Sequence, residues 1–220
     1  MNDLLKRNPS RFDRVASALS LQPVFYREIP VCIDSGPEAV VSPCRSKVEA
    51  VASIGPDGRI PEKKRWGRQD YLSLRDLAKQ EEAITPFLGG DFINLYLSPW
   101  DYHFLIFPTA GRVRAAFFQD GFSWPVVAWG GAILRNAKLV TVIETDFGFP
   151  IGLIMVASWM VAGLEPLFEM ERRYRRAERF GRFRIGSTVL LLFPPGRMEI
   201  LCRPGQKLEL GECLARASNS

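Results

Sequence analysis

The feature of this chain that most constrains its fold is a succession of short apolar runs, separated by glycine and proline, from about residue 38 onward. In one run Ile93, Leu95 and Leu97 alternate with more polar residues, and residues 113–117 and 139–144 show the same alternation. A period of two is that of a β-strand, and the 18 glycines and 16 prolines supply turns between strands. The sequence therefore predicts a β-rich α+β fold, in which short antiparallel strands form a sandwich- or barrel-like core with a few short helices.

Length and composition indicate one globular domain. A chain of 220 residues with 47% hydrophobic and 24% charged residues buries one sizeable core and leaves room only for a small second unit. We predict a helical lead-in over residues 1–30, with Ser10 capping a short amphipathic helix, and a single domain over residues 31–220. The lead-in helix either packs on the domain or lies on a membrane surface.

Three further segments carry structural expectations. Ser73 precedes apolar residues at helical spacing, which predicts a short capped helix after it, and residues 55–70 are typical of an exposed loop. Residues 147–164 carry no charge, and this length is the lower limit for a membrane-spanning helix. Because glycine and proline interrupt the run and β-branched residues are frequent in it, we expect two buried strands around a turn.

Charge and cysteine content narrow the function classes. The formal net charge of +5 is modest, and no nucleic-acid-binding motif accompanies it, so nucleic acid is not an expected partner. The four cysteines are scattered without a C-x-x-C pair, which argues against a metal site and favours reduced thiols. The first residues lack the apolar core of a secretion signal, so we expect a cytoplasmic protein.

The tripeptide Gly186-Ser187-Thr188 stands directly before an apolar run, residues 189–193. By itself it is typical of a turn in which a hydroxyl group binds nearby backbone before a strand begins. A glycine before a serine also suits self-cleavage of the backbone, because glycine leaves its carbonyl open to attack and tolerates strained angles. The surrounding residues distinguish these interpretations.

Two longer segments carry a resemblance to a known family. Residues 181–189 read Gly-Arg-Phe-Arg-Ile-Gly-Ser-Thr-Val, with Phe193 and Gly196 following. Residues 97–103 read Leu-Ser-Pro-Trp-Asp-Tyr-His and contain the single histidine, His103. Both segments resemble the phosphatidylserine decarboxylase family, whose patterns are Gly-x-Phe-x-x-Gly-Ser-Thr-Val and Leu-Ser-Pro-x-Asp-Tyr-His. A looser similarity covers about residues 38–215, most of the chain.

The resemblance implies a pyruvoyl-dependent lyase that makes its own cofactor and needs no metal. Ser187 would attack the Gly186 carbonyl, the chain would part between these residues, and Ser187 would become a pyruvoyl group. That group would react with a substrate amine and take up the electrons released with carbon dioxide. The resemblance places His103 beside the substrate and the decarboxylation step. Thr188 would help to position the cleavage loop, and Asp101 is a second supporting residue, one of the groups that could serve as the base.

Two positions depart from the family pattern. The histidine that activates the serine is the second of Asp-Tyr-His-x-x-His, and Ile106 stands in its place. The aspartate that prepares this histidine follows Ser-Pro-x, and Arg45 stands in its place. Losing general-base assistance typically costs about 10²–10⁴-fold in rate. A cleavage that happens once in the life of a molecule tolerates such a slowdown, so the departures weaken self-processing without excluding it.

Seven arginines crowd residues 172–184. They form either a solvated face with glutamate partners or a site for a lipid phosphate, because a guanidinium group matches phosphate oxygens bidentately. For the second interpretation the candidate ligands are Arg176, Arg179 and Arg182.

Three functional hypotheses follow. The first is a decarboxylase acting on phosphatidylserine or a related amine, cytoplasmic or peripheral at the inner face of the membrane. The second is a non-processing homologue that serves as a lipid-binding or regulatory module, which Ile106 and Arg45 favour. The third is an amino-acid decarboxylase with a soluble substrate. Monomer and homodimer both stay open.

Overall fold

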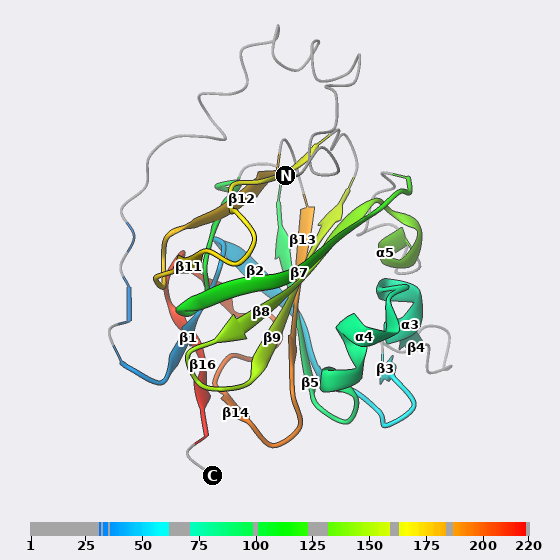
Figure 1. The fold of residues 1–220 in the computed structure, drawn as a ribbon, viewed down its shortest axis with the longest axis horizontal. Coiled ribbons are helices and arrows are strands. Elements are labelled where there is room, and N and C mark those ends of the chain that lie inside the picture. Colours follow the sequence, from blue (N-terminus) through cyan, green and yellow to red (C-terminus); the bar gives the residue numbers. More distant parts are fainter. Residues whose placement is uncertain are drawn as a thin grey trace, which may run out of the picture.

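A large antiparallel sheet forms the centre of the structure (Figure 1). The computed structural model describes residues 31, 33–34, 36–61, 71–98, 101–122, 132–158, 163–183 and 187–218. In spatial order the eight strands of the sheet are β11 (Arg173–Tyr174), β7 (Gly111–Gln119), β8 (Lys138–Thr145), β9 (Pro150–Ala157), β13 (Ser187–Phe193), β5 (Asp91–Leu97), β2 (Ser46–Ser53) and β15 (Lys207–Leu208).

Two smaller antiparallel sheets cover one face of the large sheet. Their strands, in spatial order, are β1 (Ala39–Val41), β16 (Cys213–Ala217) and β14 (Met198–Ile200), then β10 (Leu164–Pro166), β12 (Arg179–Phe183) and β6 (Phe104–Ile106). Val189, Leu191 and Phe193 of β13 point into the layer between the sheets and join one buried cluster with Phe180 and Leu214. The expected sandwich core is confirmed.

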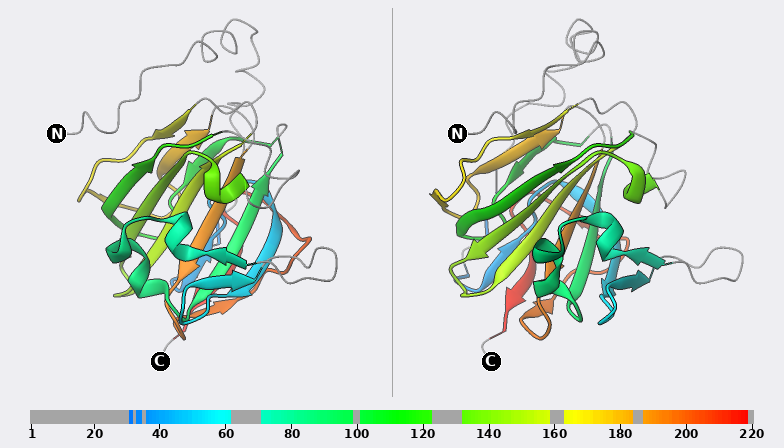
Figure 2. Two further views of the ribbon diagram at one scale, coloured as in Figure 1. Left: turned by 90° about the vertical axis from the view of Figure 1, so that its right-hand side faces the viewer. Right: turned by 45° about the vertical axis from the view of Figure 1, so that its right-hand side comes forward.

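Short helices cover the opposite face, as both views in Figure 2 show. They are α3 (Leu74–Leu77), α4 (Glu81–Ile84), the 3-10 helix η2 (Thr85–Phe87) and α5 (Ala132–Arg135), and beside them lies a two-stranded sheet of β3 (Arg59–Pro61) and β4 (Tyr71–Ser73). Leu190 and Leu192 of β13 pack on this side, in a second cluster with Leu74 and Phe87. Since β13 alternates between two buried layers, its sequence is apolar from Val189 to Phe193.

The predicted strands are confirmed. The alternating residues of 93–97 lie in β5, those of 113–117 in β7 and those of 139–144 in β8. Ile93, Leu95 and Leu97 all belong to the cluster between the sheets, so the period of two identified the buried face correctly.

Two local expectations need correction. Residues 55–70 do not form only a loop, because β3 lies within them and Ile60 is fully buried against the helices. A helix does follow Ser73, but the Ser73 side chain makes no capping hydrogen bond, since this residue ends β4 and is held by strand pairing with Arg59.

In the uncharged run 147–164, where two buried strands around a turn were expected, the described residues hold β9 in full and the first residue of β10. The turn precedes β9 and contains Gly148, whose φ of 83° lies in the left-handed region that favours glycine. β10 begins only at Leu164. No helix among the described residues is long and apolar enough to cross a membrane. The lead-in over residues 1–30, with its helix at Ser10, lies outside the described residues, so that boundary stays a prediction.

Close packing at the far end of β13 generates a stability prediction. A Cβ atom added at Gly90 would lie 1.9 Å from the Phe193 carbonyl oxygen, so Gly90→Ala must displace backbone. We expect a loss of about 2 kcal/mol or more in the free energy of unfolding, measured by urea denaturation. Gly36→Ala is the control, because its nearest neighbour is the Asp34 side chain at 3.2 Å. Equal stability of the two variants would contradict this account.

Candidate active site

Ser187 is the first residue of the central strand β13. Its backbone pairs with Leu97 on β5 and with Ala157 on β9. The long apolar run after it, buried on both faces, fixes where the strand lies. Gly186, the other half of the predicted cleavage site, lies outside the described residues. The position of residue 187 in the fold is therefore set by two neighbouring strands.

Thr188 is 1% exposed and faces the helix-covered side of the sheet, like Leu190 and Leu192. It pairs with Tyr96 on β5 and Val156 on β9. The burial gives Thr188 a fixed place beside Ser187, which is compatible with the supporting role that the resemblance implies.

His103 is fully buried just before β6. Its carbonyl oxygen accepts a hydrogen bond of 2.9 Å from the Phe183 amide. Phe183 ends β12, shortly before Ser187 in the sequence. The structure thus ties the backbone of the single histidine to Phe183, a few residues before the predicted cleavage site.

Asp101 closes a tight turn after β5. Its Oδ2 atom accepts a hydrogen bond of 2.7 Å from the Ser98 amide, and its own amide donates to the Ser98 carbonyl at 3.0 Å. Asp101 lines a cavity of about 290 Å³ together with Tyr96 and Ser98, the residues on either side of the Ser187 partner Leu97. The remaining lining residues come from two neighbouring strands and the segments around them: Arg45, Ser46, Lys47, Lys207, Leu208 and Glu209.

Burial and neighbouring carboxylates raise the pKa of two weakly acidic side chains near this cavity. Burial raises the pKa of Tyr96, and the carboxylates of Asp101 and Glu49 raise it further. Burial also raises the pKa of the Cys44 thiol to about 12; a hydrogen bond from Ser46 lowers it and the Asp101 charge raises it. Cys44 is therefore a protonated, buried thiol near neutral pH, and not a competing nucleophile.

The two positions that depart from the family pattern lie close together. Ile106 is 4% exposed in an apolar cluster with Val41 and Leu210, and its amide donates to the Pro43 carbonyl at 2.9 Å. Arg45, which follows soon after Pro43, turns to the cavity side and pairs with Glu209 at 3.2 Å. Neither side chain has the chemistry of a general base.

The three candidate arginines are engaged elsewhere. Arg176 donates to the carbonyls of Gly36 and Ala39, at 2.7 and 2.9 Å. Arg182 makes a bidentate ion pair with Glu165, at 2.7 and 2.9 Å. Arg179 lies over the Phe104 ring, 4.8 Å from its centre. The structure does not bring these arginines together at the cavity that Asp101 lines, and their proposed contact with substrate stays a prediction.

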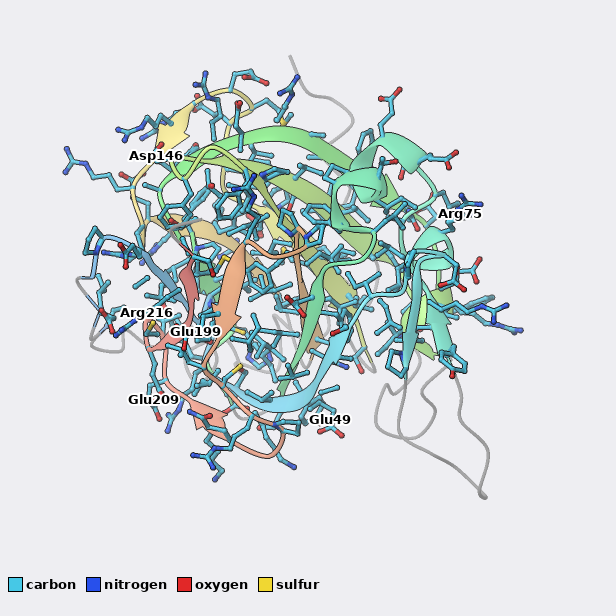
Figure 3. The ribbon with its side chains drawn as sticks, turned by 90° about the horizontal axis from the view of Figure 1, so that it is seen from below. Glu49, Arg75, Asp146, Glu199, Glu209 and Arg216 are labelled. Carbon is cyan, nitrogen blue, oxygen red and sulfur yellow. The ribbon has the colours of Figure 1, made fainter. Side chains whose placement is uncertain are left out.

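A second hollow, of about 450 Å³, lies in another part of the molecule, between Thr109, Asp146 and Arg175. Figure 3 shows Asp146 well apart from Glu209, which marks the first cavity. The second hollow contains Arg176 and none of the other predicted site residues. Among the described residues, no group of three or more His, Cys, Asp or Glu is placed to hold a metal ion.

Sequence reasoning missed the cavity residues Tyr96, Lys47 and Lys207. Strand pairing alone brings them together, because Lys207 is opposite Lys47 and Lys47 is opposite Tyr96. The one signal in the sequence is that Lys47 and Tyr96 each lie close to a motif residue, Arg45 and Leu97 respectively.

Comparison with known proteins gives a consistent result. The family model described as "Phosphatidylserine decarboxylase" matches residues 24–216. A phosphatidylserine decarboxylase proenzyme from Stutzerimonas stutzeri is 30% identical over 213 residues, covering 84% of this chain and 70% of that protein. One from Bordetella petrii is 32% identical over 212 residues, covering 83% and 71%. One from Nitrosococcus oceani is 32% identical over 182 residues, covering 72% and 58%.

The state of Cys44 predicts its reactivity. In the unfolded chain this thiol ionises near its ordinary pKa of 9.0, but in the folded protein only near 12. Alkylation with iodoacetamide at pH 8.5, followed by peptide mapping, is expected to modify the partly exposed Cys213 and spare Cys44 until urea is added. Equal labelling of Cys44 and Cys213 in the native protein would contradict the burial.

The same shift in pKa predicts how stability depends on pH. Because unfolding releases the Cys44 proton between about pH 9 and 12, the free energy of unfolding should fall as pH rises through that window.

Proposed function

The chain belongs to the phosphatidylserine decarboxylase family, and on that premise we propose that it is a pyruvoyl-dependent carboxy-lyase. It cuts its backbone between Gly186 and Ser187 and removes carbon dioxide from phosphatidylserine or a related amine. The observation that carries the proposal is the place of Ser187, at the first position of β13 and opposite Leu97, whose two neighbours line a cavity.

The cut requires only groups of the chain and one water molecule. The Ser187 hydroxyl oxygen bonds to the Gly186 carbonyl carbon, the peptide C–N bond breaks, and the hydroxyl proton passes to the freed Ser187 amine. Ser187 then loses its α-proton and the Gly186 carboxylate departs, which leaves dehydroalanine. Water hydrolyses the dehydroalanine, ammonia leaves, and residues 187–220 begin with a pyruvoyl group.

The strand after the cut fits such a group. β13 pairs with β5 along its whole length and with β9 from Ser187 to Leu192, and both of its faces are buried. A break before Ser187 removes none of these pairs, so residue 187 keeps its place between Leu97 and Ala157. When formed, the pyruvoyl carbonyl supplies an electrophile for the substrate amine and a sink for the electrons released with carbon dioxide.

The other candidate residues position parts of the site or donate a proton to the substrate. His103 is held by the bond between its carbonyl and the Phe183 amide, and its imidazole is the group that returns a proton to the decarboxylated carbon. Asp101 fixes the turn that shapes one wall of the cavity through the Ser98 amide. Thr188, buried next to Ser187, prevents that end of the strand from shifting.

A second candidate function rests on a specific observation. The two positions where the family carries its activating histidine and aspartate hold a buried aliphatic residue, Ile106, and an ion-paired cation, Arg45. Without a base an unmodified serine is a poor nucleophile. The alternative is therefore a homologue that keeps the fold intact and uses it as a lipid-binding or regulatory module.

The intact mass of the protein decides between these functions. Self-processing predicts that denatured, freshly purified protein separates into two fragments that part between Gly186 and Ser187, the smaller one with the mass expected for an N-terminal pyruvoyl group. Without denaturant the fragments should stay together, because strand pairing holds β13. Ser187→Ala should remain one chain. An uncleaved 24.8 kDa natural chain after several days would exclude the pyruvoyl enzyme and favour the binding module.

Restoring the family residues should accelerate the cut. Ile106→His together with Arg45→Asp supplies a base and its orienting carboxylate in neighbouring segments, and we expect cleavage faster by about 10²-fold or more. The rate is measured on gels after a pulse of synthesis. Ile106→Val is the matched control, because it preserves the apolar cluster and supplies no base. An unchanged rate in the folded double variant would refute the idea that these positions limit processing.

A further inference from the structure

Two lysines face each other at the edge of the large sheet. Lys47 on β2 and Lys207 on β15 are directly opposite in the antiparallel register, so their side chains leave the same face of the sheet. Both residues are exposed, and within the described part of the chain neither has an ion-pair partner. Like charges in this arrangement repel each other. An anion between them would remove the repulsion.

The cavity beside the lysines adds a third cation. Arg45 lines it together with Lys47 and Lys207. Of the carboxylates in the lining, Glu209 is engaged by Arg45 at 3.2 Å and Asp101 by the Ser98 amide at 2.7 Å. The volume of about 290 Å³ is large enough for a phosphate group with several water molecules. The lining therefore carries three cations against two carboxylates, and within the described residues its unpaired cations are the opposed lysines.

Strand register connects this cavity to the cleavage site. Lys207, Lys47, Tyr96 and Thr188 are successive partners across β15, β2, β5 and β13, and Ser187 precedes Thr188. Neighbouring strands are about 4.8 Å apart, so Lys47 and Thr188 are separated by about 10 Å in the sheet. Flexible lysine side chains can extend over part of this distance. In a phosphoserine head group the amine and the phosphate are separated only by the short serine side chain.

We infer that Lys47, Lys207 and Arg45 bind a phosphate group, the phosphodiester of the substrate head group, while its amine is at residue 187. This inference rests on the proposed function and names the substrate class of the same site. It assigns Arg45 a binding role at a position where the family carries a carboxylate. The phosphodiester comes either from a membrane lipid or from a soluble ester with the same head group.

Binding is tested on the full chain carrying Ser187→Ala, which remains uncleaved and performs no turnover. Isothermal titration calorimetry at low ionic strength should detect binding of glycerophosphoserine and, more weakly, of inorganic phosphate. Lys47→Gln with Lys207→Gln should weaken binding of glycerophosphoserine by about tenfold or more, because two charge-assisted contacts are lost. Lys79→Gln is the matched control and should leave binding unchanged, because Lys79 is another exposed lysine but lies between α3 and α4. No binding of either probe, or equal binding by the double variant, would overturn the site.

Vesicle flotation identifies the source of the phosphate. Association with phosphatidylserine vesicles but not phosphatidylcholine vesicles, reduced by the lysine double variant, supports the site with a lipid substrate. Binding of glycerophosphoserine without flotation supports the site with a soluble ester.

The proposed decarboxylase activity and the proposed phosphate site can be refuted independently. A natural chain that never cleaves but binds glycerophosphoserine through the lysines overturns the decarboxylase and keeps the site. A processed, active decarboxylase whose KM for phosphatidylserine is unchanged by the lysine double variant overturns the site and keeps the decarboxylase.

Discussion

The two-sided antiparallel pairing of β13 is the constraint on which the rest of the structure depends. The strand is held by β5 on one edge and β9 on the other, while its side chains alternate between the sandwich core and the helix-covered layer. This pairing buries a continuous apolar run while giving its backbone N–H and C=O groups partners on both edges. Residue 187 therefore lies at a defined point of the sheet, whether or not the peptide bond before it is intact.

Burial also explains why the two departures from the family pattern occur together. The pocket around Ile106 is apolar, and an imidazole there would lose its hydration unless a carboxylate compensated for it. An aspartate at position 45 without the histidine would in turn face the cavity beside Asp101 and Glu209, where like charges repel. An isoleucine and an arginine that pairs with Glu209 remove both costs at once.

Sequence reasoning predicted the strands and the position of Ser187 well, because period-two alternation and motif order are local signals. It placed the buried face of β5 correctly. In β7 an irregularity between Val113 and Ala115 shifts the alternation, so Val113 joins the cluster between the sheets while Ala115 and Phe117 pack on the helix-covered side. Sequence reasoning assigned residues 55–70 to a loop and missed β3 within them. This short strand is stabilised by pairing with β4 and by the burial of Ile60, and such tertiary effects are not visible in the local sequence. Sequence reasoning did not predict the cavity, for the same reason. Lys47, Tyr96 and Lys207 are distant in the sequence, and only the register of three strands makes them neighbours.

In the proposed function, the residue at position 45 affects both self-cleavage and substrate binding. A carboxylate at this position would give the cavity a negative charge, whereas the guanidinium group gives it a positive one, next to Lys47 and Lys207. In the proposed decarboxylase, self-cleavage occurs once per molecule, so a slow cleavage costs little activity over the life of the protein. Substrate binding recurs in every turnover, so a cation that attracts a phosphodiester contributes each time. An arginine in place of the aspartate would therefore slow a single event and favour a repeated one.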